Sequence, residues 1–250
     1  MNNIQKALEN GQSIWLDSIS RDMLRSGELQ RFVDLGVTGV TSNPSIFDKA
    51  ISESDIYDES LIEYAKDGAT RETVFERLAV DDIRDAADVL RPVYDDAGRR
   101  DGFVSIEVSP TLAHDKGGTV AEARRLWAAI DRPNIMIKVP GTPAGVPAIK
   151  CLIADGINVN VTLLFALEAY KAAANACIEG LTEFATSGRG NPGGVASVAS
   201  FFVSRVDTSV DNALPEGHQL RGKIGIANAK LAYAEFSEMF DRNLGGGGSF

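Results

Sequence analysis

Six short runs rich in Val and Ile alternate with longer amphipathic stretches, and this alternation constrains the fold more than any other feature of the chain. Each run is bounded by Gly, Pro, Asn or Asp, as β-strands commonly are. We expect strands at Ile14–Asp17, Val37–Asn43, Phe103–Val108, Ile135–Val139, Ile157–Leu164 and Val195–Phe202. Because parallel strands need helical crossovers between them, the pattern predicts an α/β fold, either a doubly wound sheet or a (β/α)-barrel.

The stretches between the runs carry helical spacing. One set of apolar residues recurs at i, i+3, i+4 and i+7, namely Ile83, Ala86, Ala87, Leu90 and Tyr94. Asp81 and Asp82 just before it are well placed for the N-terminus of that helix, where negative charge is favourable. Ser20 can cap a helix that carries Met23 and Leu24. A late helix is marked by Ile224, Ala227, Leu231 and Ala234.

The polar residues of the runs distinguish a barrel from an open sheet. In Ile157–Leu164, Asn158, Asn160 and Thr162 share one face, opposite Ile157, Val159, Val161 and Leu163. A doubly wound sheet is apolar on both faces, because helices cover both. Helices outside and polar groups inside are typical of a barrel, whose active site lies at the carboxyl ends of its strands. The candidates near those ends are Asp17, Asn43, Glu107, Lys138 and Thr162.

Charge and composition exclude several classes of function. The 250 residues carry a net charge of −10, which argues against sequence-independent nucleic-acid binding. A small anionic substrate is still compatible with that charge, because a few local cations can hold it. No apolar run approaches the roughly 18 residues of a membrane span, and Met1–Lys6 lacks the apolar region of a secretory signal. We therefore expect a soluble, cytoplasmic protein whose two cysteines, Cys151 and Cys177, are buried thiols.

Lys138 is the most informative residue of the chain. It lies within the apolar run Ile135–Val139, where a lysine without a partner is costly. It is either a structural lysine that pairs with a carboxylate or reaches the barrel rim, or an amine that attacks a carbonyl to form a Schiff base. Aldol chemistry through a Schiff base needs proton transfers at two places, and Asp17 and Glu107 on other strands supply two carboxylates. This combination favours the catalytic interpretation.

The remaining motifs give weaker evidence about the function. Asn160 and Thr162 match a glycosylation sequon, but a buried strand in a cytosolic chain is not glycosylated, so a polar role in the site is preferred. Arg205 can hold a phosphate, with Ser200 nearby, although a surface ion pair is the simpler interpretation of a lone arginine. His114 and His218 are far apart and show no metal-ligand spacing, so we expect loop residues and no metal site. No nucleotide-binding glycine motif is present.

Six segments in order resemble the transaldolase family, in its longer bacterial-type branch, from about Ile14 to about Phe240. They are Trp15–Ser18, Thr41–Ser45, Ser105–Val108, Ile137–Pro140, Asn160–Phe165 and Ser200–Arg205. The resemblance implies a TIM-barrel enzyme of the pentose phosphate pathway that moves a dihydroxyacetone unit between sugar phosphates without metal or cofactor.

The resemblance also implies a role for each residue. Lys138 would form the imine with a ketose phosphate, Glu107 would shuttle protons through a water held with Thr162, and Asp17 would take the proton of the C4 hydroxyl. The substrate-binding residues would be Asn43, Asn160 and Ser200 for hydroxyls, Phe202 as a wall of the site, and Arg205 for phosphate.

The sequence departs from the family pattern after the sixth strand. We expect only six of the eight strands of a (β/α)8 barrel, in one domain over residues 1–243, followed by a linker-like tail at 244–250. Six strands leave two sheet edges, which leaves open a homo-oligomer or a complementing chain. The alternatives are a non-catalytic barrel fragment, a module of a fusion with a sugar-phosphate isomerase, or a small aldolase that releases free dihydroxyacetone.

Overall fold

The structure is a computed structural model that describes residues 2–243. Its strands are β1 Trp15–Leu16, β2 Gly39–Val40, β3 Val104–Glu107, β4 Ile135–Pro140, β5 Val159–Leu164 and β6 Ser197–Phe201. The helices of the first half are α1 Asn3–Glu9, α2 Arg21–Arg25, α3 Glu28–Leu35, α4 Pro44–Ser52, α5 Asp58–Lys66 and α6 Arg71–Asp96. Those that follow are α7 Lys116–Ile130, α8 Gly145–Ala154, α9 Leu167–Thr186, α10 Ser204–Ala213 and α11 Ile224–Asn243. Short 3₁₀ turns are η1 Asp55–Tyr57, η2 Pro110–Leu112 and η3 Pro192–Gly194.

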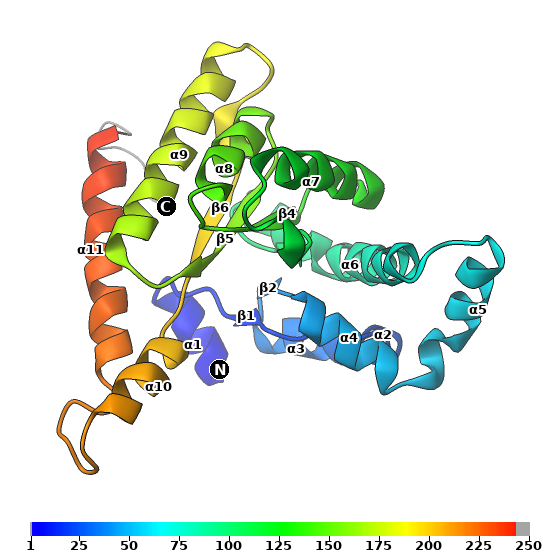
Figure 1. The fold of residues 1–250 in the computed structure, drawn as a ribbon, viewed down its shortest axis with the longest axis horizontal. Helices are drawn as coiled ribbons and strands as arrows, with labels where there is room; N and C mark the ends of the chain where they lie inside the picture. Colours follow the sequence, from blue (N-terminus) through cyan, green and yellow to red (C-terminus); the bar gives the residue numbers. More distant parts are fainter. Residues whose placement is uncertain (1, 244–250) are drawn as a thin grey trace. The chain divides into compact units, whose positions relative to one another are not determined.

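The sheet follows the order of the sequence, β1-β2-β3-β4-β5-β6, with helices between successive strands (Figure 1). The pairs β1–β2, β2–β3 and β5–β6 are parallel. A doubly wound sheet reverses its strand order at a switch point, whereas a (β/α)-barrel adds each strand beside the last. The prediction of an α/β fold of barrel type, with six strands in the described part of the chain, is therefore confirmed.

The strands lie where the sequence predicts them, but most are shorter. The run Val37–Asn43 contributes only Gly39 and Val40 to the sheet, because Thr41–Asn43 leave it to begin α4. Asn158 lies directly before β5 rather than within it. Strand β4 is the exception, because Pro140 extends it by one residue.

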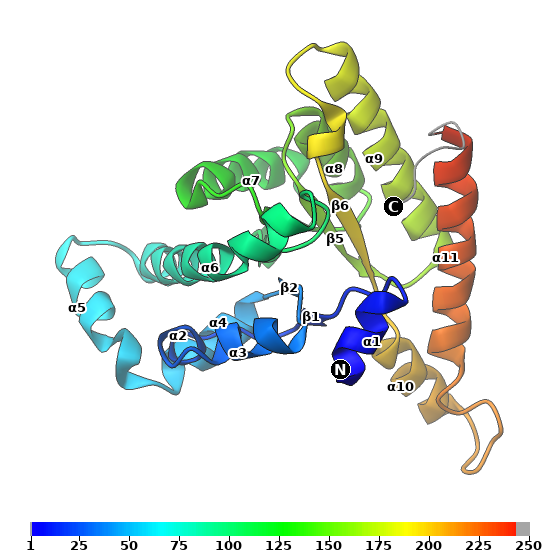
Figure 2. The same ribbon diagram turned by 180° about the vertical axis from the view of Figure 1, so that it is seen from behind.

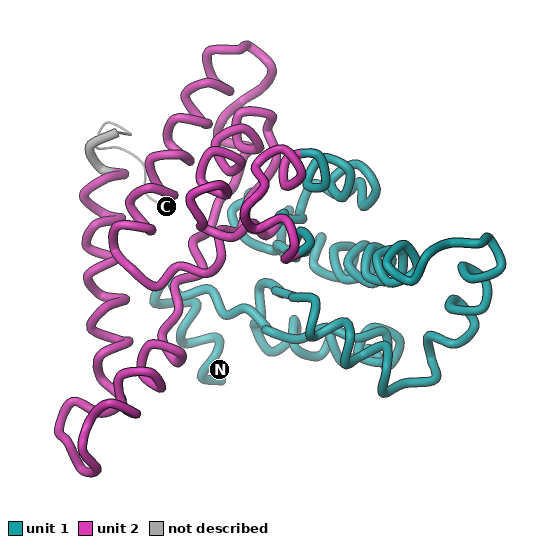
Figure 3. The backbone as a smooth tube through the Cα atoms, viewed as in Figure 1, with its two compact units in different colours: residues 1–109, 121–137 teal, residues 110–120, 138–250 magenta. Residues whose placement is uncertain are grey.

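The chain divides into two compact units, residues 1–109 with 121–137 and residues 110–120 with 138–250 (Figure 3). In unit 1, β1, β2 and β3 pair side by side, and α6 packs against β3. The helix buries an apolar stripe that includes Leu78, Ile83, Ala87 and Leu90, each with no exposed surface.

In unit 2, α8 and α9 pack on each other and on β5, and α11 lies along α9 (Figures 1 and 2). Gly180 permits the close approach of α9 to α8, because a Cβ there would lie 2.7 Å from the carbonyl oxygen of Lys150. The polar residues Asn158, Asn160 and Thr162 are all buried, at 2%, 1% and 2% exposure.

The predicted start of α6 is wrong. The helix begins at Arg71, with the Thr70 hydroxyl accepting the backbone N–H of Thr73, so Asp81 and Asp82 lie in its middle. The buried stripe continues upstream through Val74 and Leu78, and this extension displaces the N-terminus by about three turns. Asp82 is fully buried, and it pairs there with Arg21 instead of capping a helix.

The other helix predictions are confirmed. The Ser20 hydroxyl accepts the N–H of Met23 at 3.2 Å and caps α2, and the late helix is α11. None of the helices within residues 2–243 combines the length and apolar character that crossing a bilayer requires. The predicted linker-like tail at 244–250 lies outside the described residues.

Candidate active site

Three candidate residues lie at the carboxyl ends of the strands of unit 1. Asp17 directly follows β1 and is exposed, Asn43 lies three residues beyond Val40 of β2, and Glu107 is the last residue of β3 and half-buried. Because β1, β2 and β3 are parallel neighbours, their carboxyl ends lie on the same side of the sheet. The structure therefore gathers Asp17, Asn43 and Glu107 at one end of this sheet, as the sequence predicts.

Asn43 has a structural role that sequence reasoning did not assign. Its side-chain oxygen Oδ1 accepts the N–H of Ile46 at 3.0 Å and caps α4, with Pro44 at the first helical position. The neighbouring Ser42 donates its hydroxyl to the carbonyl of Ser105 at 2.7 Å, which ties β2 to β3 at this end of the sheet. The cap leaves the Nδ2 amide of Asn43 as the group that can donate to a ligand.

Lys138 and Thr162 lie on neighbouring strands of unit 2. Lys138 is the fourth residue of β4 and is only 7% exposed, and Thr162 of β5 is 2% exposed. Gly141, three residues after Lys138, donates its N–H to the carbonyl of Thr162 at 2.7 Å. The polar ends of β4 and β5 are thus joined by a backbone hydrogen bond.

Strand β6 adds the next candidate. Ser200 donates its hydroxyl to Oδ1 of the buried Asn160 at 2.7 Å. One step earlier, Oδ1 of Asn158 accepts the N–H of Ala196 at 2.8 Å. The side chains of Asn158 and Asn160 are therefore both held by the segment that contains β6, and Asn160 and Ser200 form a hydrogen-bonded pair.

Phe202 and Arg205 follow β6 directly. The Phe202 ring is half-buried, and the Arg205 guanidinium carbon lies 4.5 Å from its centroid. Arg205 is exposed, is the second residue of α10, and forms no ion pair with the side chains of residues 2–240. A surface ion pair therefore does not account for this arginine, and its position in the first turn of a helix adds to the attraction for an anion.

One face assignment is wrong. The alternation along β5 predicts Leu163 beside Val161 on the helix-covered face, yet Leu163 is 39% exposed and Leu164 is fully buried. The β5–β6 register shifts between Val161 and Leu164, and Leu163 has a φ of 60°. A β-bulge thus inserts one extra residue, and the buried position passes to Leu164.

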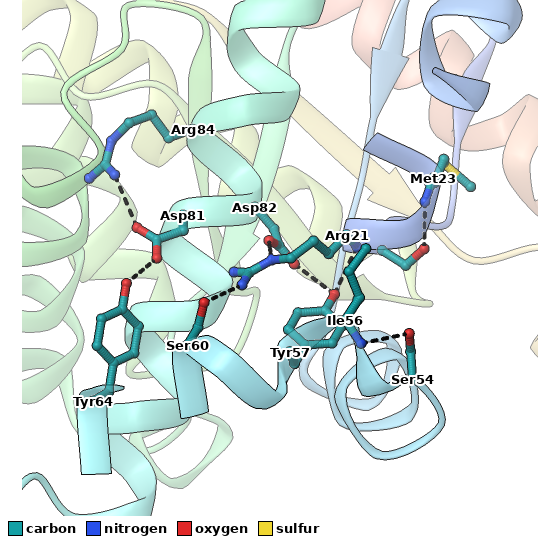
Figure 4. Close-up of polar contacts among 11 residues, drawn as sticks. Arg21, Met23, Ser54, Ile56, Tyr57, Ser60, Tyr64, Asp81, Asp82 and Arg84 are labelled. Atoms are coloured by element: carbon teal, nitrogen blue, oxygen red, sulfur yellow. Dashed lines mark hydrogen bonds and ion pairs between the residues drawn. The ribbon is translucent and has the colours of Figure 1, made fainter. Parts of the chain in front are cut away.

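A buried polar network in unit 1 was not predicted (Figure 4). Arg21 donates from Nε to Asp82 Oδ1 at 2.8 Å, and the Tyr57 hydroxyl donates to Asp82 Oδ2 at 2.7 Å. Nη1 of Arg21 also reaches the hydroxyl of Ser60 at 2.8 Å. Arg21, Tyr57 and Asp82 are 6%, 0% and 0% exposed. The network joins α2, η1, α5 and α6, and we interpret it as structural.

Burial acts in the same direction on both acidic groups of this network. It raises the pKa of Asp82, an effect that the hydrogen bonds from Arg21 and Tyr57 oppose without cancelling. It also raises the pKa of Tyr57 above its ordinary value. Nearby, the hydrogen bond to Asp81 raises the pKa of Tyr64 to about 12. No pairing of charged residues along the sequence signals this network, because Arg21 and Asp82 are 61 positions apart.

The two cysteines lie on helices α8 and α9, and the two histidines lie outside the helices and strands. Cys177 is buried, which raises the pKa of its thiol, and Cys151 is half-buried; both are free thiols. His114 and His218 lie in loops, as predicted. Within the described part of the chain, no group of three or more His, Cys, Asp or Glu side chains is arranged to hold a metal ion.

Comparison with known proteins shows the family. A profile of the Transaldolase/Fructose-6-phosphate aldolase family matches residues 14–243. The chain is 48% identical over 237 residues to the transaldolase of Mycobacterium ulcerans, 50% over 243 residues to that of Thermobifida fusca, and 49% over 242 residues to that of Saccharopolyspora erythraea. These alignments cover 92–95% of the chain but 63–66% of the relatives' own length. The match over nearly all of the described residues means that this chain belongs to the transaldolase/fructose-6-phosphate aldolase family.

Proposed function

We propose that the chain is a transaldolase that acts through a Schiff base on Lys138. The reaction moves a dihydroxyacetone unit between sugar phosphates: sedoheptulose 7-phosphate and glyceraldehyde 3-phosphate give erythrose 4-phosphate and fructose 6-phosphate. The relatives named transaldolase and the buried lysine on β4 support this assignment. The proposal treats residues 1–243 as one barrel domain, in which both compact units serve a single cytoplasmic enzyme.

The first stage is imine formation. The neutral amine of Lys138 attacks the C2 carbonyl of the ketose phosphate, and the resulting carbinolamine loses water to give the imine. Glu107 shuttles the protons of both steps through a water held with Thr162. The protonated imine then withdraws electrons from C3, so no metal or organic cofactor is required.

The second stage is cleavage of the bond between C3 and C4. Asp17 takes the proton of the C4 hydroxyl, the C3–C4 electron pair moves toward the imine, and an aldose phosphate departs. A dihydroxyacetone enamine stays on Lys138. A second aldose phosphate accepts the three-carbon unit by the reverse steps, its new hydroxyl takes the proton from Asp17, and water releases the product ketose.

The remaining candidates bind substrate. Asn43, Asn160 and Ser200 orient the sugar hydroxyls, and Phe202 forms a wall of the site. Arg205 binds the phosphate; a guanidinium suits this role because it offers a planar fork of N–H donors.

The observation that carries the proposal is the burial of Lys138, at 7% exposure, on a strand joined to that of Thr162. The test is transfer itself: fructose 6-phosphate and erythrose 4-phosphate are incubated with the chain, and sedoheptulose 7-phosphate is measured. Lys138→Arg serves as the charge-matched control, because its guanidinium cannot form an imine. Transfer by the original chain and none by the variant supports the proposal, whereas equal transfer by both refutes it.

The family profile also covers fructose-6-phosphate aldolases, and this gives a second candidate function. An aldolase releases free dihydroxyacetone instead of passing the three-carbon unit to an acceptor. The same incubation without erythrose 4-phosphate distinguishes the two. Continuous release of free dihydroxyacetone and glyceraldehyde 3-phosphate without an acceptor identifies an aldolase, whereas release of glyceraldehyde 3-phosphate that requires the acceptor aldose identifies a transaldolase.

A further inference from the structure

Two aromatic rings and a guanidinium form a connected stacking cluster in unit 2, made up of Phe165, Phe202 and Arg205. The rings of Phe165 and Phe202 are nearly parallel, with centroids 4.9 Å apart and an angle of 10° between their planes. The guanidinium carbon of Arg205 lies 4.5 Å from the centroid of Phe202. Phe202 therefore contacts both Phe165 and Arg205, and it links the ring of Phe165 to the guanidinium.

The backbone around Phe165 is fixed by contacts from two directions. The N–H of Phe202 donates to the carbonyl of Leu164 at 2.9 Å, which holds the two aromatic residues in register. Asn228 of α11 donates from Nδ2 to the carbonyl of Phe165 at 2.7 Å. The bulge at Leu163 shifts the alternation just before this point, so that Leu164 is buried and the next residue, Phe165, is 39% exposed.

This arrangement is unusual for a phenylalanine with a packing role alone. Phe165 leaves over a third of its surface exposed, and its partner Phe202 is itself only half-buried. A guanidinium stacked on a ring face keeps its N–H donors around the edge of its own plane, where an oxyanion can accept them. The stack thus restricts the orientation of Arg205 without occupying the donors that an anion needs.

We infer that Phe165 is a positioning residue for phosphate recognition. It fixes the ring of Phe202 by stacking on it, and Phe202 in turn holds the guanidinium of Arg205 in the orientation that accepts a phosphate group. The inference rests on the proposed function in one respect, namely that the bound phosphate belongs to a sugar phosphate. Loss of the Phe165 ring should weaken phosphate binding and leave the reaction at the ketose carbonyl unchanged.

The primary test measures phosphate binding without any reaction at Lys138. Inorganic phosphate is titrated against modification of Arg205 by phenylglyoxal, with the modified peptide quantified by mass spectrometry. We expect Phe165→Leu to raise the half-protecting phosphate concentration about fivefold. Phe165→Tyr, which keeps the ring, should restore the original value. Tyr233→Leu is the control, because Tyr233 is an exposed aromatic residue of the same unit that stacks on Phe236 instead.

A second measurement detects a general structural effect of the substitution. Imine formation is trapped with borohydride over a range of ketose concentrations, using fructose 6-phosphate and the unphosphorylated dihydroxyacetone. Phe165→Leu should raise the half-saturating concentration of fructose 6-phosphate and leave that of dihydroxyacetone unchanged. An equal change for both ketoses would mean a structural role and would overturn the inference.

The outcomes separate the two proposals. Absence of trapping in the original chain, with phosphate protection of Arg205 still sensitive to Phe165→Leu, refutes the proposed reaction and supports the positioning role. Protection that is absent in the original chain, or identical in Phe165→Leu, overturns the positioning role whether or not the imine forms.

Discussion

Replacement of Arg21 by methionine should leave the carboxylate of Asp82 buried without its charge partner. The two side chains are 7% and 1% exposed, so water cannot replace the guanidinium. Breaking a buried pair from one side typically costs about 3–5 kcal/mol. Arg21 also lies over the Tyr57 ring at 4.6 Å, a contact that contributes up to about 2 kcal/mol when desolvated.

Protonation of Asp82 sets an upper limit on the electrostatic part of this cost. An aspartate with an unfolded-state pKa of about 3.9 is protonated at pH 7 at a cost of about 4 kcal/mol, and at pH 5 at a cost of about 1.5 kcal/mol. Burial already raises the pKa of Asp82, and removal of Arg21 removes an interaction that lowers it. The folded variant therefore binds a proton more readily than the unfolded chain does, so its stability deficit is largest at neutral pH and shrinks as the pH falls.

The assay is urea unfolding followed by tryptophan fluorescence. Both tryptophans, Trp15 and Trp127, belong to unit 1, which also contains Arg21 and Asp82. We expect Arg21→Met to lose about 3–5 kcal/mol at pH 7 and about 2 kcal/mol less at pH 5. The matched control is Arg132→Met, since Arg132 pairs with Asp88 on the surface and should lose at most about 1 kcal/mol at either pH.

The double variant Arg21→Met/Asp82→Asn tests the cause. An asparagine keeps an acceptor for the hydroxyl of Tyr57 but carries no charge, so the double variant should regain about 2 kcal/mol relative to Arg21→Met at pH 7. A deficit in Arg21→Met that is the same at pH 5 and pH 7, or that Asp82→Asn does not reduce, would refute the reasoning.

Three further predictions concern the candidate site. Gly141→Ala places a Cβ 2.6 Å from the side chain of the buried Leu164 and should lower the free energy of unfolding, measured in circular-dichroism melts, by about 1–3 kcal/mol. Gly194→Ala is the control and should be neutral, because nothing lies within 4 Å of its Cβ; equal stability of the two variants would contradict this prediction. Asn43→Ala removes the α4 cap and should cost about 1 kcal/mol in urea unfolding, and Asn43→Ser should recover most of it, so an effect of both variants alike counts against the cap. Asp17→Asn should slow carbon–carbon cleavage roughly 10²–10⁴-fold while the imine still forms, and loss of the imine would mean that its role is assigned wrongly.

The sequence predicts the sheet well because each strand is marked locally. Val and Ile runs with Gly, Pro or Asn at their ends need no tertiary partner to be recognised, so all six strands lie where expected. The start of α6 was missed for the opposite reason. Thr70 caps the helix ahead of a largely polar first turn, and only the buried Val74 and Leu78 reveal that the helix has begun.

Features that depend on distant contacts could not be predicted. Nothing local indicates that Arg21 meets Asp82, or that Asn228 of α11 holds the backbone of Phe165. The bulge at Leu163 interrupts the two-residue alternation, which is the only signal that such an argument can use. Lys138, Asn160 and Thr162 were found because their polar character conflicts with the buried strands that carry them. The roles of Asn43 and Phe202 follow only from the resemblance to the family.

The most direct measurement of the central claim is a covalent one. The chain is incubated with fructose 6-phosphate, reduced with borohydride, and digested for peptide mass spectrometry. We expect a three-carbon adduct on Lys138, which requires ketose binding, imine formation and cleavage of the carbon–carbon bond in sequence. A folded sample, verified by circular dichroism, that carries no adduct or carries it on another lysine would contradict the account.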